Sequence, residues 1–135
     1  PSRPRHPRQQ SNHRRRQCDY QKHCVAGSAG AQLHSALADV PVAAAFFKGQ
    51  HSAAYSGFEG KTNDGEGLAD WLRAHDVDII DVVGIATDYC VRATVLDALR
   101  EGFEVRVLTD LVAAVADETG EAALQEMVGT GAQLA

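Results

Sequence analysis

Three short apolar runs that alternate with amphipathic segments restrict this chain to few fold classes. The apolar runs, bounded by glycine, proline or charged residues, are 42–47, 79–85 and 105–108. Short runs of this kind predict buried strands. Apolar residues recur every three or four positions in 67–75, 88–101 and 117–128, which predicts helices. Strands that alternate with helices predict an α/β fold, with a parallel sheet between helix layers.

Smaller signals refine this outline. We expect a helical turn within 31–38, and a long functional loop over 49–67, which contains five glycines. Asp88 suits the N-cap of helix 88–101, Gly102 suits its end, and the last three residues suit the start of a fourth strand. The side chains expected to face inward from helix 117–128 are Ala122, Leu124, Met127 and Val128.

The charge is divided unevenly along the chain, although the net charge is only -5. Residues 1–22 carry seven basic side chains and one acidic one, whereas the rest carry six basic and 17 acidic ones. The basic lead has no apolar periodicity, so we expect it to be disordered. Residues 23–135 are expected to form the folded domain.

Composition indicates the cellular setting. The chain has 44% hydrophobic and 23% charged residues, which excludes a wholly disordered protein. No run reaches the roughly 18 apolar residues of a membrane-spanning helix, and no secretory signal is visible. Three cysteines argue against a disulfide scaffold, so we expect a cytoplasmic protein. The chain starts at Pro1 rather than Met, and we therefore expect a fragment or an imperfect reading of the gene.

Cys90 is the strongest candidate for chemistry. It closes the run G-I-A-T-D-Y-C, which joins the predicted strand 79–85 to the predicted helix 88–101. Ligands of open α/β sheets bind at the carboxyl ends of strands. The unpaired N–H groups and partial positive charge of a helix N-terminus favour a thiolate there. The alternative is that Cys90 is a small buried side chain, as many free cysteines are.

Other candidates surround this position in the expected topology. Lys48 follows the run 42–47, so it would stabilise negative charge beside Cys90, unless it is simply solvated. Tyr55 and Phe58 of the glycine loop would line a pocket for a flat ligand, or pack locally. His23 is a candidate metal ligand or a surface histidine. The upstream histidines and cysteines do not have zinc-finger spacing.

Several of these motifs together resemble one family. F-K-G at 47–49, Y-S-G-F-E-G at 55–60, W-L-R at 71–73 and V-V-G-I-A-T-D-Y-C-V at 82–91 resemble the nicotinamidase/pyrazinamidase branch of the isochorismatase-like cysteine hydrolases. H-C-V-A-G from His23 is similar to the segment that supplies the last metal-binding histidine in that branch. The resemblance runs from about His23 to Ala135, roughly the back two thirds of a family domain.

The resemblance implies a three-layer α/β/α sandwich with a mostly parallel sheet, here lacking the first strands. Cys90 matches the nucleophile that attacks the carboxamide carbon of nicotinamide and forms a thioester. Lys48 matches the lysine of the catalytic triad. The backbone N–H groups of Ala86 and Cys90 match the oxyanion hole, and the family has a cis peptide at the bond that matches Ile85–Ala86.

The resemblance also implies ligands and partners. Tyr55 matches an aromatic residue of the substrate pocket, and His23 matches one ligand of a divalent metal ion: zinc, manganese or iron. The expected partner is a small molecule, nicotinamide or pyrazinamide, with no membrane partner. Nucleic acid is the less favoured partner, and a homo-oligomer stays open.

The chain departs from the family pattern upstream of His23. No residue matches the aspartate that serves as general base, and Asp19 lies in the wrong kind of segment. The other metal ligands also have no match, so we expect the catalytic activity of this chain to be impaired.

Two alternatives to this function remain. One is a non-catalytic isochorismatase-like module with a basic nucleic-acid-binding arm, and the other is an amidohydrolase or isochorismatase relative that acts on another small substrate.

Overall fold

The computed structural model describes residues 28–49 and 53–135. The predicted disordered lead and His23 lie outside these residues. The chain divides into one unit that ends at Val40 and a second unit, Pro41–Ala135. In the first unit, a 3₁₀ turn at Ser35–Leu37 lies within the predicted helical turn 31–38, and a further 3₁₀ turn at Ala29–Ala31 lies at its beginning.

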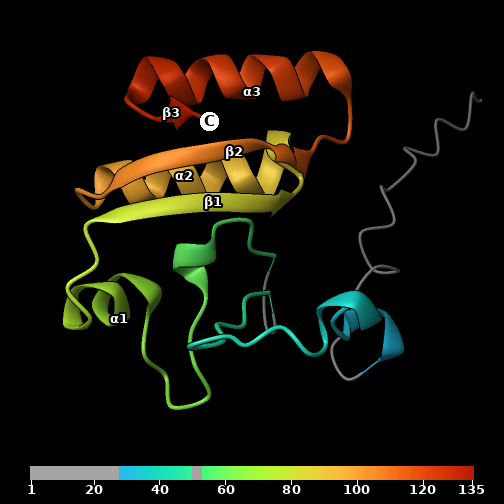
Figure 1. Cartoon of the computed structure of the whole chain (residues 1–135), viewed down its shortest axis with the longest axis vertical. Helices are drawn as coiled ribbons and strands as arrows, with labels where there is room; N and C mark the ends of the chain where they lie inside the picture. Colours follow the sequence, from blue (N-terminus) through green and yellow to red (C-terminus); the bar gives the residue numbers. More distant parts are fainter. Residues whose placement is uncertain (1–27, 50–52) are drawn as a thin grey trace, which may run out of the picture. The chain divides into compact units, whose positions relative to one another are not determined.

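The second unit is built on a parallel sheet, as the sequence predicts (Figure 1). Strand β1 (Ile79–Ile85) pairs with β2 (Glu104–Ala113), and β2 pairs with the short β3 (Gln133–Leu134). The register places Val82 opposite Val107 and shifts between Val82 and Gly84. All three strands therefore point the same way, and their carboxyl ends meet at one edge.

Helices connect these strands and cover one face of the sheet. Helix α1 (Leu68–Ala74) precedes β1, α2 (Arg92–Arg100) links β1 to β2, and α3 (Asp117–Thr130) links β2 to β3. One buried cluster joins α2, α3 and the strands, and its members include Val82, Val95, Ala98, Val105, Val107, Ala123 and Met127. Both α2 and α3 therefore pack on the same face. Alternate residues of β1, such as Ile79, Val83 and Ile85, are exposed.

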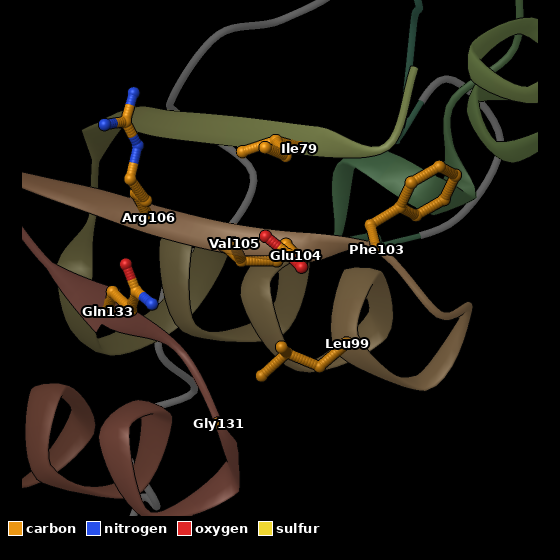
Figure 2. A pocket seen from close by; sticks show the side chains of 8 residues that line it. All are labelled: Ile79, Leu99, Phe103, Glu104, Val105, Arg106, Gly131 and Gln133. Carbon is orange, nitrogen blue, oxygen red and sulfur yellow. The ribbon is translucent and has the colours of Figure 1, made fainter. Parts of the chain in front are cut away.

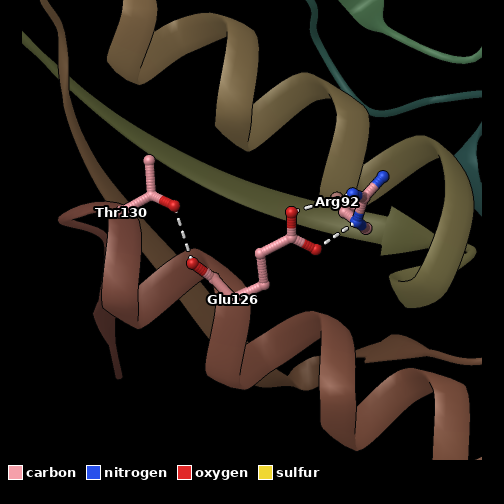
Figure 3. A network of polar contacts seen from close by, with 3 residues as sticks. All are labelled: Arg92, Glu126 and Thr130. Atoms are coloured by element: carbon pink, nitrogen blue, oxygen red, sulfur yellow. Dashed lines mark hydrogen bonds and ion pairs between the residues drawn. The ribbon is translucent and has the colours of Figure 1, made fainter.

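An ion pair joins these two helices at the surface (Figure 3). The Arg92 guanidinium donates to both carboxylate oxygens of Glu126, at 2.6 and 2.8 Å. This bidentate contact raises the pKa of Arg92 and lowers the pKa of Glu126. Both side chains are well exposed, so the pair adds little to the free energy of unfolding.

No helix among the described residues is long and apolar enough to cross a bilayer.

Three sequence predictions about these elements were wrong. Residues 42–47 do not form a strand: only Phe47 makes an isolated antiparallel bridge, with Lys61. An apolar run becomes a strand only where a neighbouring strand pairs with it. Ala122 and Val128 are exposed, because the inward face of α3 is set by Gly120, Ala123 and Met127.

Asp88 is the third correction, because it is not the N-cap of a helix. The backbone at Thr87–Val91 forms a π-helical turn whose N-cap is Ala86, and α2 follows directly. The carboxylate of Asp88 instead accepts hydrogen bonds from residues 27 to 31 positions further along the chain. The inward face of helix 88–101 is nevertheless confirmed, since Val91, Val95 and Ala98 are buried.

Two glycines of α3 provide a matched test of how tightly this helix packs. A Cβ on Gly120 would lie 2.4 Å from the Cβ of Ala114, whereas a Cβ on Gly129 would meet nothing within 4 Å. We expect Gly120→Ala to destabilise the protein by about 1–3 kcal/mol, because neither Cβ can rotate away. Gly129→Ala should stabilise it by up to about 1 kcal/mol through helix propensity. Urea unfolding of both variants checks this, and equal effects would contradict the packing.

Candidate active site

The turn after β1 carries Cys90. Strand β1 ends at Ile85, the Ile85–Ala86 peptide bond is cis, and Cys90 lies in the π-helical turn that follows. Cys90 is a half-buried free thiol. The structure thus places it at the carboxyl end of a parallel strand, where the sequence predicts it and where α/β sheets bind ligands.

A pocket of about 180 Å³ opens beside this turn. Its lining residues are Lys48, Gly57, Val82, Val83, Ile85, Cys90, Val91 and Thr94. Two predicted site residues that are far apart in the sequence, Lys48 and Cys90, therefore face one cavity. Val82, Val83 and Ile85 of β1, with Val91 from the turn, give the wall its apolar side chains. Ala86 lies half-buried at the start of the turn.

Lys48 and Tyr55 are linked directly. The Lys48 ammonium donates a hydrogen bond to the backbone carbonyl of Tyr55. The Tyr55 ring lies 5.9 Å, centroid to centroid, from the ring of Tyr89, next to Cys90 in sequence. Tyr55 therefore lies near the turn, although it is not among the residues that line the pocket. Phe58 does not line the pocket: its ring lies 6.1 Å from that of Phe103 and packs against the core.

A capping box gives the loop its shape, a feature that the sequence interpretation missed. Residues Gly57–Glu59 form a 3₁₀ turn capped by Ser56, whose hydroxyl accepts from the N–H of Phe58. The Glu59 carboxylate accepts from the N–H groups of Tyr55 and Ser56, at 2.9 and 3.0 Å. The spacing S-x-x-E at 56–59 is the signal that could have revealed it.

Asp88 fastens the cysteine turn to the beginning of α3. Its buried carboxylate accepts from the Val115 and Ala116 N–H groups and, at 2.6 Å, from the Thr119 hydroxyl. The Thr119 hydroxyl, followed by the Val115 N–H, lowers the pKa of Asp88, although burial acts in the opposite direction. The carboxylate therefore holds the turn most firmly when it is ionised.

This arrangement predicts an acid-sensitive contribution to stability. The pKa of Asp88 in the folded protein lies below its ordinary value of 3.8. The stability that the ionised carboxylate contributes is therefore fully present above pH 3.8, and it is lost as the pH falls through the lowered pKa. Asp88→Asn should lower the melting temperature at about pH 7, and the difference from the natural protein should shrink toward about pH 3. Thermal unfolding across this range checks it, with Asp97→Asn as a control; a difference independent of pH would contradict the assignment.

Metal ligands do not gather in the described part of the chain. Among residues 28–49 and 53–135, no group of three or more His, Cys, Asp or Glu side chains is placed to hold a metal ion. These residues alone do not fit a metal centre. The predicted ligand His23 lies outside them, so the structure does not place it.

A second cavity, of about 490 Å³, lies at the opposite ends of the strands (Figure 2). Its lining includes Ile79, Glu104 and Gln133, the first residues of β1, β2 and β3. Of the residues that the structure describes, no cysteine, lysine or histidine lines it. Because ligand sites of such sheets lie at the carboxyl ends, the pocket beside Cys90 is the better candidate active site.

The parallel sheet, with Cys90 in the turn between a strand and a helix, agrees with the result of a comparison with protein families. A family model described as the isochorismatase domain matches residues 2–135. The chain belongs to the isochorismatase family.

Nicotinamidases are prominent among its relatives, which confirms the resemblance noted in the sequence. The chain is 52% identical over 105 residues to the nicotinamidase/pyrazinamidase of Mycobacterium tuberculosis, covering 78% of this chain and 56% of the relative. It is 44% identical over 117 residues to the nicotinamidase of Escherichia coli, covering 83% and 55%. The chain therefore spans a little over half the length of these relatives.

Solved structures confirm the α/β fold. The pyrazinamidase of Pyrococcus horikoshii in complex with zinc matches with a TM-score of 0.70 and 42% identity, covering 84% of this chain and 60% of that one. PnC1 of L. infantum in complex with nicotinate matches with a TM-score of 0.69 and 36% identity, covering 84% and 58%.

Proposed function

We propose that this chain carries the nucleophile side of a nicotinamidase-type active site, with Cys90 and Lys48 as its catalytic residues. The observation that carries the proposal is that both side chains line one pocket at the carboxyl end of β1. The similarity to nicotinamidases and pyrazinamidases supports the substrate class, an aromatic carboxamide.

The proposed reaction is hydrolysis of nicotinamide to nicotinate and ammonia. The Cys90 thiolate attacks the carboxamide carbon, and the carbonyl oxygen becomes an oxyanion that accepts from the N–H groups of Ala86 and Cys90. The C–N bond breaks, ammonia leaves with an added proton, and a thioester remains. Water then attacks the thioester, releases nicotinate and restores the thiol.

Lys48 and Tyr55 would serve this reaction in different ways. The Lys48 ammonium places positive charge in the pocket, which stabilises the negative charge that develops in the transition state. The Tyr55 ring, beside that of Tyr89, offers an aromatic face for the flat pyridine ring. A divalent metal, with His23 among its ligands, is part of the proposal for the pyridine side of the site, supported by the zinc complex of the Pyrococcus horikoshii pyrazinamidase.

The reaction needs a further acid–base group, which gives a proton to the leaving ammonia and takes one from the attacking water. Among the residues described, the pocket lining contains neither a carboxylate nor an imidazole. General acid–base catalysis contributes about 100- to 10,000-fold to such reactions. We therefore propose that turnover by residues 1–135 alone is slower by about this factor than turnover by the Mycobacterium tuberculosis relative.

Ammonia release from nicotinamide and pyrazinamide tests both statements. The purified chain is assayed with and without zinc, manganese or iron, beside the Mycobacterium tuberculosis enzyme. We expect slow, Cys90-dependent release from both amides. Turnover equal to that of the relative would refute the impairment, and faster turnover of an unrelated amide would refute the substrate assignment.

A further inference from the structure

The hydroxyl of Thr94 joins two sides of the pocket. Thr94 lies in the first turn of α2 and lines the pocket together with Lys48 and Cys90. Its Oγ1 accepts a hydrogen bond from the Gly57 N–H at 2.8 Å and donates one to the Cys90 carbonyl at 2.7 Å. One hydroxyl thus bridges the 3₁₀ turn of the glycine loop and the turn that carries the nucleophile.

The first of these bonds leads to Lys48 through a short series of contacts. Gly57 begins the 3₁₀ turn, whose capping box fixes the backbone of Tyr55 and Ser56 through Glu59. The carbonyl of Tyr55 in turn accepts from the Lys48 ammonium. A displacement of the 3₁₀ turn relative to α2 would therefore move the hydrogen-bond partner of Lys48 relative to Cys90.

Packing around the bridge is close. A Cβ on Gly57 would lie 3.5 Å from the Thr94 methyl carbon, so the loop backbone lies directly against α2 at this point. The bridging hydroxyl cannot reverse its direction, because the Gly57 N–H can only donate and the Cys90 carbonyl can only accept. Loss of the hydroxyl would leave both groups without this partner, which favours a shift of the loop.

We propose that Thr94 is a positioning residue. Its hydroxyl fixes the position of the glycine loop, and with it the Lys48 ammonium, relative to the turn that carries Cys90. The inference rests on the proposed roles of Cys90 and Lys48. It goes beyond them because it assigns their alignment to a side chain that need not touch the substrate.

Thr130 supplies a matched control. Its hydroxyl also donates to the carbonyl four residues earlier, Glu126, at 2.8 Å (Figure 3). The residues that line the pocket do not include Thr130. Thr130→Val therefore removes the same kind of intrahelical bond without removing a bridge to the loop.

The test is a double-mutant cycle on the alkylation rate of Cys90 by iodoacetamide, followed at the Cys90 peptide by mass spectrometry over a range of pH. Lys48→Met is measured in the natural chain and in Thr94→Val, Thr94→Ser and Thr130→Val backgrounds. Because Lys48 and Cys90 line the same pocket, loss of the ammonium charge in Lys48→Met should slow alkylation of Cys90 severalfold. In Thr94→Val the effect should fall below about twofold, whereas Thr94→Ser and Thr130→Val should retain it.

Several results would overturn the inference. These are an unchanged Lys48 effect in Thr94→Val, no Lys48 effect in the natural chain, or a Thr94→Ser variant that behaves like Thr94→Val. If Thr94→Val does not fold, Thr94→Ala replaces it, and failure of both while Thr94→Ser folds would assign the hydroxyl to stability alone. Alkylation needs no amide, so a failure of the proposed nicotinamide hydrolysis would be seen separately in the ammonia assay.

Discussion

Cys90→Ala is expected to reduce nicotinamide hydrolysis to the background rate and to remove the fast-reacting thiol of the protein. Without the sulfur no thioester forms, and no other nucleophilic side chain among the described residues lines the pocket except Lys48 and Thr94. Ammonia release and iodoacetamide labelling both measure this. Removal of a nucleophile that works with a partner group costs about as much as removal of the whole set.

The matched control for this prediction is Cys24→Ala, which leaves Cys90 in place. Cys90 should be alkylated faster than Cys24 in the folded protein, because it lies in the strand-to-helix turn where α/β sheets place their reactive groups. Equal rates, or continued hydrolysis by Cys90→Ala, would remove Cys90 from the mechanism.

Lys48→Arg is expected to lower turnover strongly, although it preserves the positive charge. The ammonium lines the pocket and also donates to the Tyr55 carbonyl. A planar guanidinium is larger and presents its donors in a fixed fork. In a pocket of about 180 Å³ it cannot keep its charge where the ammonium lies and also donate to the Tyr55 carbonyl in the same way. A misplacement of about 1 Å can cost on the order of a hundredfold in rate.

Lys61→Arg is a suitable control for Lys48→Arg, because Lys61 is exposed and does not line the pocket. Turnover should be unchanged in Lys61→Arg and reduced in Lys48→Arg, with similar melting temperatures. Near-natural turnover by Lys48→Arg would show that Lys48 is not part of the site.

The sequence predicts best those features that depend on neighbouring residues. The strand at 79–85 and the site of Cys90 after it are marked by a compact apolar run and by the amphipathic segment that follows, and the structure has both. Gly102, at a φ of 93°, also lies just after α2, as expected of a residue that ends a helix.

Features that depend on distant residues were missed. The run 42–47 has the composition of a strand, but composition does not say whether a partner strand lies beside it. The local pattern suits Asp88 to a helix cap, but the groups that donate to its carboxylate, the Val115 N–H and the Thr119 hydroxyl, lie 27 and 31 positions further along the chain. The Thr94–Gly57 contact joins residues 37 positions apart, and no local pattern marks it.

Acylation of the protein by para-nitrophenyl nicotinate tests most directly whether Cys90 and Lys48 form a nucleophilic site. The nitrophenolate group leaves without an added proton, so the step needs the thiolate and the pocket but no general acid. The account predicts a burst of one equivalent of nitrophenolate, a nicotinoyl group on the Cys90 peptide, a slower burst in Lys48→Arg and none in Cys90→Ala. A burst that persists in Cys90→Ala, or a nicotinoyl group found on Cys18 or Cys24 instead, would contradict it.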